Sequence, residues 1–221
     1  MNIWRITLVA GSDFHTSSEA KGSTIDYLRD ADNIPYIPGT HVKGVMRTEA
    51  ERILRSIQGI DCWITGDLEM DDASDDKKRP IKTCEELKNG DYGCNVCRVF
   101  GMPNDTGGKY REGKIRVTDF TAHGKVISAS RMHVSIDRDT LSNKKGALFQ
   151  TRVVPKGCKF TGHIIMKSLN EDEEKLLKGS LHSMAHYGLG GERSRGLGSF
   201  TIESLDQISY ENFLKGGGSF D

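Results

Sequence analysis

Two amphipathic helices set between strand-like runs are the feature that most constrains the fold of this chain. Apolar residues from Val42 to Ile57 recur at three- and four-residue spacing and are followed by Gly59, which predicts the first helix. The second helix is predicted over residues 171–187, where acidic side chains fill the first turn and Gly188 comes next. Strand-like patterns cover four further ranges: residues 2–10, 114–121, 159–167 and 197–204. The resulting order β-α-β-β-α-β predicts an α+β fold with a ferredoxin-like core.

Three segments are additional to this core. Residues 11–38 are rich in Gly, Ser, Asp and Asn and show no helical or strand period, which is typical of a functional or disordered connection. Residues 60–101 have the composition of an insertion, and residues 126–154 predict a long β-hairpin with a polar tip at residues 139–146. We expect the core and these additions to form a single domain of residues 1–221.

Charge is distributed unevenly along the chain. The 31 basic and 31 acidic residues cancel, which by itself argues against a protein that binds nucleic acid. Residues 107–168, however, contain thirteen basic and four acidic side chains, whereas residues 61–91 contain five basic and ten acidic ones. This segregation favours a surface that binds a polyanion, with clustered solvated faces as the alternative interpretation.

The sequence also argues against a membrane-embedded or secreted protein. No run approaches the roughly 18 apolar residues that a membrane-spanning helix needs. The first residues pass directly into a strand-like pattern, so we expect no signal peptide and a cytoplasmic protein without membrane contact.

Two basic segments are candidates for binding phosphate. Five glycines surround Arg193 and Arg195 in residues 188–198, and glycine lets backbone N–H groups approach a phosphate chain closely. The alternative is a plain helix-to-strand connection. Lys43 and Arg47 lie four residues apart on the first predicted helix, after a Pro-Gly turn, and this spacing suits adjacent phosphates or an ordinary solvated face.

Four cysteines in the insertion suggest a structural zinc site. Cys94 and Cys97 have C-x-x-C spacing, and Cys84 and Cys62 belong to the same segment, with His15 as an alternative fourth ligand. Unligated buried thiols and a redox role are the other interpretations.

Asp26 lies in the Gly/Ser-rich segment near basic residues. A carboxylate there is a candidate for metal-assisted or acid–base chemistry on a phosphodiester, although aspartate is also a common loop residue.

Three of these motifs together resemble a known family. Residues 35–47 (PYIPGTHVKGVMR), 97–101 (CRVFG) and 190–198 (GGERSRGLG) are similar to the RAMP (repeat-associated mysterious protein) superfamily of CRISPR systems. The likeness runs from about residue 11 to residue 200 and is strongest to the backbone subunit of type III effector complexes. It implies a modified RNA-recognition motif with ferredoxin-like topology, a zinc-bearing lid at residues 60–101 and a thumb hairpin at residues 126–154.

The resemblance also implies a function. Copies or paralogues of such a subunit line up with other subunits along a guide RNA (crRNA). Asp26 would cut the paired target RNA with a divalent cation, Mg²⁺ or Mn²⁺. In the family, each thumb displaces one nucleotide of the guide–target duplex. The candidates for this hydrophobic wedge are Met132, Val134, Leu148 and Phe149. The residues expected to contact RNA are Lys43, Arg47, Arg131, His133, Arg152, Gly190, Gly191, Arg193, Ser194, Arg195 and Gly196.

Two alternatives remain open. One is a non-catalytic structural subunit in which Asp26 is only a loop residue. The other is a guide-processing endoribonuclease that needs no metal and uses histidine as general acid and base.

Overall fold

A computed structural model describes residues 2–21, 23–58, 94–102 and 112–215 of the chain. Its main sheet is antiparallel, and a short strand, β5 (Ile115–Val117), also pairs with β9 (Lys159–Met166) of that sheet. Two helices connect these strands, so the expected α+β class is confirmed. The strand order in the main sheet is β10 (Phe200–Ile208), β1 (Asn2–Ala10), β9 (Lys159–Met166), β6 (Phe120–Ala122) and β4 (Tyr36–Ile37).

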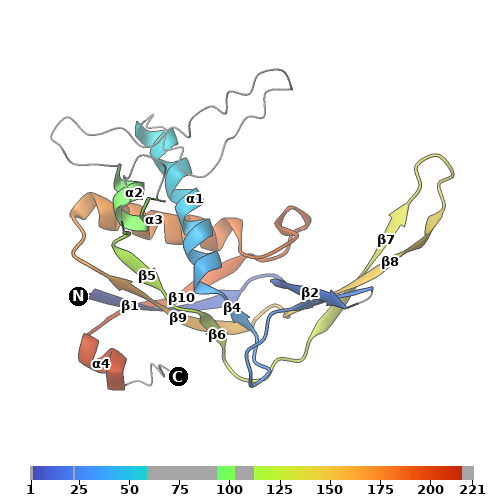
Figure 1. Cartoon of the computed structure of the whole chain (residues 1–221), viewed down its shortest axis with the longest axis horizontal. Helices are drawn as coiled ribbons and strands as arrows, with labels where there is room; N and C mark the ends of the chain where they lie inside the picture. The colour runs from blue at the N-terminus through green and yellow to red at the C-terminus, as the bar shows by residue number, and fades with distance from the viewer. Residues whose placement is uncertain (1, 22, 59–93, 103–111, 216–221) are drawn as a thin grey trace.

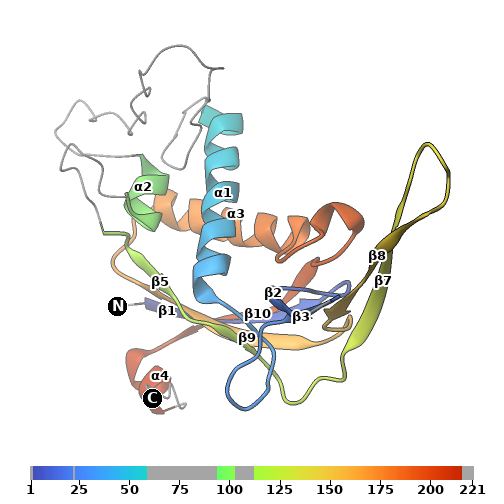
Figure 2. The same ribbon diagram turned by 45° about the vertical axis from the view of Figure 1, so that its right-hand side comes forward.

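The two long helices cover one face of the main sheet. They are α1 (Gly39–Gln58) and α3 (Glu171–Tyr187), which pack against each other (Figures 1 and 2). Most of the stripe that predicted α1 is buried, with Val42, Met46 and Ala50 fully inaccessible, whereas Ile57 at its end is 75% exposed. Alternate side chains of β1 meet these helices in a continuous apolar core, because successive residues of a strand point to opposite faces.

The start of α1 depends on a glycine. The Gly39 N–H donates to Asp119 Oδ1 at 2.7 Å, and a Cβ at this position would collide with the carbonyl oxygen of Val117. This contact ties the first turn of α1 to the segment between β5 and β6. The Pro-Gly turn therefore has a packing role at the point where α1 meets the sheet.

The opposite face of the main sheet is covered near the strand ends by a short helix, α4 (Tyr210–Lys215). Phe213 is 6% exposed and its ring lies 5.0 Å from that of His163 on β9. None of the described helices is long and apolar enough to span a membrane.

A second, small sheet projects from the body (Figure 2). Its strand order is β2 (Ser17–Lys21), β3 (Thr24–Tyr27), β8 (Asn143–Val153) and β7 (Ala129–Ile136). Strands β7 and β8 are the two sides of the hairpin expected at residues 126–154. Strand β3 pairs in parallel with β8, and this pairing attaches residues 11–38 to the hairpin.

Several expected boundaries were wrong. Residues 11–38 contain three strands, β2, β3 and β4, because pairing with distant strands stabilises segments too short to show a period of their own. The hairpin turn is closed by a hydrogen bond from the Asp137 N–H to the Ser142 carbonyl at 2.9 Å, so its tip lies earlier than residues 139–146. The run at 114–121 is divided between β5 and β6, and the run at 197–204 extends to the end of β10.

A buried ion pair between Glu173 of α3 and Lys114, the residue before β5, holds α3 to β5. Lys114 Nζ donates to both carboxylate oxygens of Glu173, at 2.7 and 2.6 Å, and Glu173 is fully buried. The same carboxylate accepts from the Asn170 N–H at 2.9 Å, while Asn170 Oδ1 accepts from the Glu173 N–H at 2.8 Å. This capping box begins α3. The Lys114 N–H donates to the Val99 carbonyl at the end of α2 (Asn95–Phe100).

Replacing Glu173 should therefore destabilise the chain strongly. We expect Glu173→Ala to lower the free energy of unfolding by about 3 kcal/mol, because it leaves the Lys114 ammonium without its buried partner. Glu171→Ala, in the same helical turn, removes an exposed pair with Lys175 and should cost at most about 0.5 kcal/mol. Urea unfolding followed by circular dichroism measures both, and equal losses would contradict the assignment.

Candidate functional site

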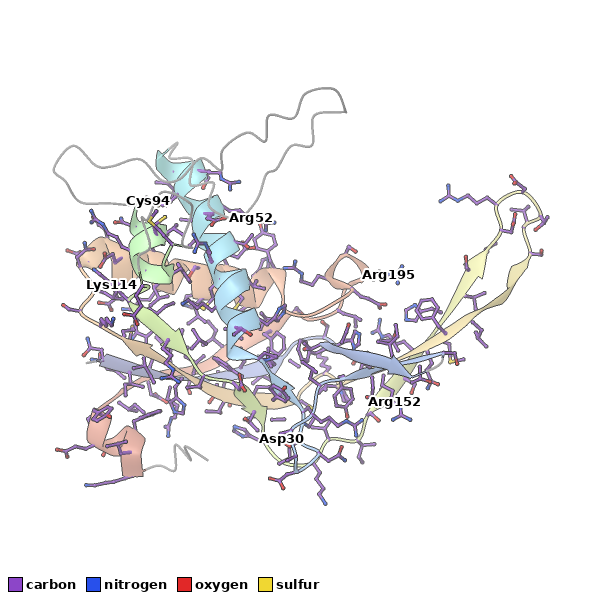
Figure 3. The ribbon with its side chains drawn as sticks, in the orientation of Figure 1. Asp30, Arg52, Cys94, Lys114, Arg152 and Arg195 are labelled. Atoms are coloured by element: carbon purple, nitrogen blue, oxygen red, sulfur yellow. The ribbon has the colours of Figure 1, made fainter. Side chains whose placement is uncertain are left out.

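Asp26 lies on β3, and its carboxylate is bound from two sides. Oδ1 accepts hydrogen bonds from the Tyr27 N–H at 2.9 Å and from Arg29 Nη2 at 3.2 Å. Oδ2 accepts from Arg152 Nη1 at 3.2 Å. The parallel pairing of β3 and β8 brings the Asp26 and Arg152 side chains together, and Figure 3 shows Arg152 at the base of the hairpin. Arg29 was missed in the sequence, although its position three residues after Asp26 is a usable signal.

An exposed apolar stripe runs along the hairpin from this site. Cross-strand partners on β7 and β8 include Met132 opposite Gln150 and Val134 opposite Leu148. Because these β8 residues are two and four positions from Arg152, they share its face of the small sheet. Met132 is 60% exposed, Val134 48% and Leu148 54%. At about 3.4 Å per residue, Leu148 lies about 13 Å along β8 from Arg152.

Phe149, the fourth wedge candidate, faces the other side of the hairpin. Its ring stacks on His133 with 4.7 Å between centroids. His133 Nε2 lies 3.7 Å from Glu192 Oε2, so this pair connects the hairpin to the glycine-rich loop after α3. The position of Phe149 therefore favours a supporting role at the base of the hairpin.

The glycines of that loop serve close packing. The Gly190 N–H donates to His41 Nε2 at 2.9 Å, and the Gly191 N–H donates to the His15 carbonyl at 2.8 Å. A Cβ at Gly190, where φ is +84°, would collide with the His15 carbonyl oxygen. Because the N–H groups of Gly190 and Gly191 are bound to protein acceptors, these two groups are not directed at a phosphate.

The charged part of the loop is a short 3-10 turn, Arg193–Arg195, and its side chains are exposed together with Gly196. The Gly196 N–H donates to the Arg193 carbonyl at 3.0 Å. Arg195 also forms an ion pair with Glu192 at 3.3 Å. Figure 3 places Arg195 on the side of the molecule from which the hairpin projects. Arg193, Ser194 and Arg195 thus present polar groups toward solvent beside the hairpin.

Asp13 joins the first loop to the hairpin. Its Oδ2 accepts from Arg131 Nε at 3.3 Å and Nη2 at 2.8 Å, and its Oδ1 accepts from the Lys156 N–H at 3.1 Å. Burial alone would raise the pKa of Asp13, but the hydrogen bonds from Arg131 and Lys156 and the Arg131 charge lower it below its usual range. Sequence reasoning missed Asp13, since no pattern distinguishes it from other loop aspartates.

Two histidines lie beside the glycine-rich loop. Burial lowers the pKa of His41, and the nearby Arg193 charge lowers it further. Burial also lowers the pKa of His15, partly offset by Glu192. The His15 Nε2 contacts Ser17 Oγ at 3.2 Å, which places the ring at the start of β2. The His41 ring and the His15 carbonyl hold the loop in place by accepting from the N–H groups of Gly190 and Gly191.

Lys43 and Arg47 differ in their surroundings. Lys43 is half-buried, and burial together with the Arg47 charge lowers its pKa. Arg47 is 13% exposed, and its guanidinium donates to Glu51 at 3.0 Å and to the Gly101 carbonyl at 2.8 Å. Arg47 therefore anchors the end of α2 to α1, and an RNA contact by either residue stays a prediction.

The C-x-x-C cysteines are buried at the start of α2, with their Sγ atoms 3.7 Å apart. Two thiolates at about 2.3 Å from a tetrahedral zinc ion stand about 3.8 Å apart, so Cys94 and Cys97 fit two of its four positions. Cys62 and Cys84 lie outside the described residues. Among the described residues no group of three or more His, Cys, Asp or Glu side chains is placed to hold a metal ion, and the remaining ligands, His15 included, stay a prediction.

Comparison with known proteins now identifies the family. The model of the RAMP superfamily matches residues 7–201. The chain belongs to the RAMP superfamily. This confirms the resemblance that the three sequence motifs indicated.

Solved structures support the fold of this RAMP protein. A type IV-B CRISPR complex contains a chain that matches with a TM-score of 0.62 and 18% identity, over 94% of this chain and 91% of the other. A type III-B Cmr-beta complex bound to cognate target RNA gives a TM-score of 0.59 and 15% identity. That match covers 94% of the RAMP protein and 61% of the other chain. No curated protein matches in sequence.

The lowered pKa of His41 predicts how the stability of the RAMP protein depends on pH. Because burial lowers the pKa of His41, the unfolded chain takes up protons below about pH 6.5 that the folded chain does not. Stability is therefore complete above this pH and falls as the pH is lowered. We expect the melting temperature to drop between pH 7.5 and 5.5, and to drop less in His41→Gln. The exposed His182 provides the control, since His182→Gln should match the wild type at every pH.

Proposed function

We propose that this RAMP protein is a guide-RNA-binding backbone subunit of a CRISPR effector complex that cleaves guide-paired target RNA. In this proposal its core is the ferredoxin-like, modified RNA-recognition motif, and the main-sheet order β10-β1-β9-β6 supports that topology. The observation that carries the proposal is the position of Asp26. It lies between two arginines on the face of the small sheet that also carries the exposed apolar stripe.

Exposed cations near the hairpin support RNA binding. Arg195 has a side chain 62% exposed and Arg152 one that is 44% exposed, and both lie where the hairpin leaves the body (Figure 3). Guanidinium groups bind phosphate oxygens through two parallel N–H bonds. Contacts of this kind recognise the RNA backbone and leave the choice of sequence to base pairing with a guide.

The exposed apolar stripe of the hairpin supports a role in unstacking the bases of bound RNA. Met132, Val134 and Leu148 form exposed apolar surface along the hairpin. Apolar side chains inserted between bases unstack them in other nucleic-acid complexes. Leu148 lies about 13 Å along β8 from Arg152, at about 3.4 Å per residue, so a nucleotide displaced by these side chains would lie near Asp26.

Asp26 supplies the acid–base chemistry in this proposal. The 2′-hydroxyl oxygen of the target attacks the adjacent phosphorus, its proton passes to the Asp26 carboxylate, and the 5′ oxygen leaves with a proton from water. Arg152 stabilises the charge that develops on the phosphoryl oxygens. The donor set does not fit a preformed divalent-cation site, because one carboxylate faces two guanidiniums. The expected Mg²⁺ or Mn²⁺ therefore stays a prediction, and no step depends on it.

A non-catalytic subunit is the second candidate. The pairing of Asp26 with Arg29 and Arg152 favours it, because a neutralised carboxylate can serve structure alone. The structures of similar fold come from both type III-B and type IV-B complexes. A type III assignment and partnership with other subunits thus remain parts of the proposal. His15 is buried and the His41 ring accepts from the Gly190 N–H, so neither histidine supports a guide-processing role.

Cleavage tests the role of Asp26. In a guide-loaded assembly, we expect Asp26→Asn to slow cutting of end-labelled complementary RNA by about a hundredfold or more, because the proton acceptor is lost. Asp32→Asn removes the same charge from an exposed site in the following loop and should cut at the wild-type rate. Full activity of Asp26→Asn would support the non-catalytic subunit.

RNA binding has a separate test. For the purified chain, the slope of log affinity against log salt should fall by about 0.7 for each lost contact with single-stranded RNA. We expect this change for Arg193→Gln and Arg195→Gln by fluorescence anisotropy. Arg5→Gln, a change at an exposed residue on β1 paired with Asp206, should leave the slope unchanged. Equal effects at all three positions would contradict a defined RNA surface.

Zinc is proposed as a structural ion of the lid, held by Cys94 and Cys97 together with ligands from the preceding insertion, for which Cys62 and Cys84 are the candidates. It would fix a segment too small for a core of its own. We expect about one zinc ion per chain by elemental analysis, with loss of the metal in a Cys94→Ser, Cys97→Ser double variant. Cys158→Ser, at a half-buried cysteine on the turn before β9, should keep the metal. A metal-free wild-type protein purified without chelator would overturn the site.

A further inference from the structure

Arg29 and Arg152 form an anion site whose present occupant is the Asp26 carboxylate. The two guanidiniums reach different oxygens of that carboxylate, each at 3.2 Å. Among the described residues, the cluster contains one carboxylate and two guanidiniums. It is partly open to solvent, with the Asp26 side chain 30% exposed and that of Arg152 44% exposed.

The two arginines are not held equally. Arg29 donates from Nη1 to Asn33 Oδ1 at 2.9 Å, and its guanidinium lies 4.4 Å from the centroid of the Tyr27 ring. Arg29 is therefore fixed by three contacts within its own segment. Arg152 comes from the hairpin and reaches the cluster through Nη1 alone in the described part of the chain. Of the two, Arg152 is the one that can exchange its partner.

Carboxylate and phosphate compete for the same groups. A guanidinium binds either anion with the same forked geometry. An ion pair as exposed as Asp26–Arg152 is weak, so an RNA phosphate can replace the carboxylate on Arg152 at little cost. Asp26 would keep its bonds from Arg29 and from the Tyr27 N–H, and these hold its Oδ1 in place.

We propose that Arg152 and Arg29 are an RNA phosphate site and that Asp26 is its internal counterion until RNA arrives. Binding of a phosphodiester to Arg152 breaks the hydrogen bond from Arg152 to Asp26 Oδ2. The inference rests on the RNA binding proposed above and goes beyond it in coupling phosphate capture to exposure of the carboxylate. The chain without RNA then holds Asp26 in a neutralised state.

This coupling gives RNA binding and cleavage opposite responses to one substitution. Asp26→Asn removes the competing charge, while the amide oxygen can still accept from the Tyr27 N–H. We expect it to tighten binding of a fluorescein-labelled single-stranded RNA to the full chain by about fivefold, which is the size of a weak exposed ion pair. Asp32→Asn, with the same change in net charge, should shift the dissociation constant by less than about twofold, because the charge of this exposed side chain is screened by salt.

A double variant isolates the pair. Arg152→Gln should weaken binding, and Asp26→Asn should give no further tightening when combined with it, because the two residues act through one contact. Arg152→Lys keeps the charge and should retain part of the affinity for RNA. This variant replaces Arg152→Gln in the experiment if circular dichroism shows that Arg152→Gln does not fold.

The outcomes separate the two proposals. If the wild-type chain binds no RNA, the proposed function fails. If it binds RNA and Asp26→Asn binds equally or more weakly, or if tightening persists without Arg152, the exchange of carboxylate for phosphate is overturned and RNA binding stands. Tightening that equals that of Asp32→Asn also overturns it, because general charge would then explain the gain.

Discussion

The parallel pairing of β3 with β8 is the contact on which the candidate site depends. It joins a segment from the first loop to the base of a hairpin more than a hundred residues later in the chain. Without it, Asp26 and Arg152 would belong to separate loops, and the apolar face of the hairpin would have no fixed relation to either. Asp13 reinforces the same junction through Arg131 and the Lys156 N–H. The site is therefore assembled by tertiary pairing, and local segments contribute only its side chains.

Sequence patterns predicted the elements that bury a regular face. The α1 stripe and the whole of α3 agree with the structure because each pattern extends over several turns and ends at a glycine. Strands β2 and β3 were missed because four or five residues are too few to show a period, and β3 pairs with the remote strand β8. For the same reason Asp26 and Arg152 could be named one by one, while their ion pair and the role of Arg29 could not.

Overall neutrality of the chain has a local explanation at this site. Asp13, Asp26 and Glu192 each pair with an arginine from a segment that the sequence analysis assigned to RNA. The acidic partners hold the long basic side chains in place before any ligand arrives, which reduces the entropy lost on binding. Net charge therefore says little about such a surface, because carboxylates that position its arginines cancel their charge in the total.

The glycine-rich loop shows how the same residues can be explained in two ways from sequence. Glycines beside arginines suggested a loop whose backbone cradles phosphate, yet the N–H groups of Gly190 and Gly191 bind His41 and the His15 carbonyl. Close packing against the first loop requires the glycines, and this packing fixes where Arg193 and Arg195 leave the body. A loop held by internal bonds can present two exposed guanidiniums at a constant spacing along a phosphate backbone. Rigidity of this kind matches a protein that recognises the shape of RNA and leaves its sequence to a guide.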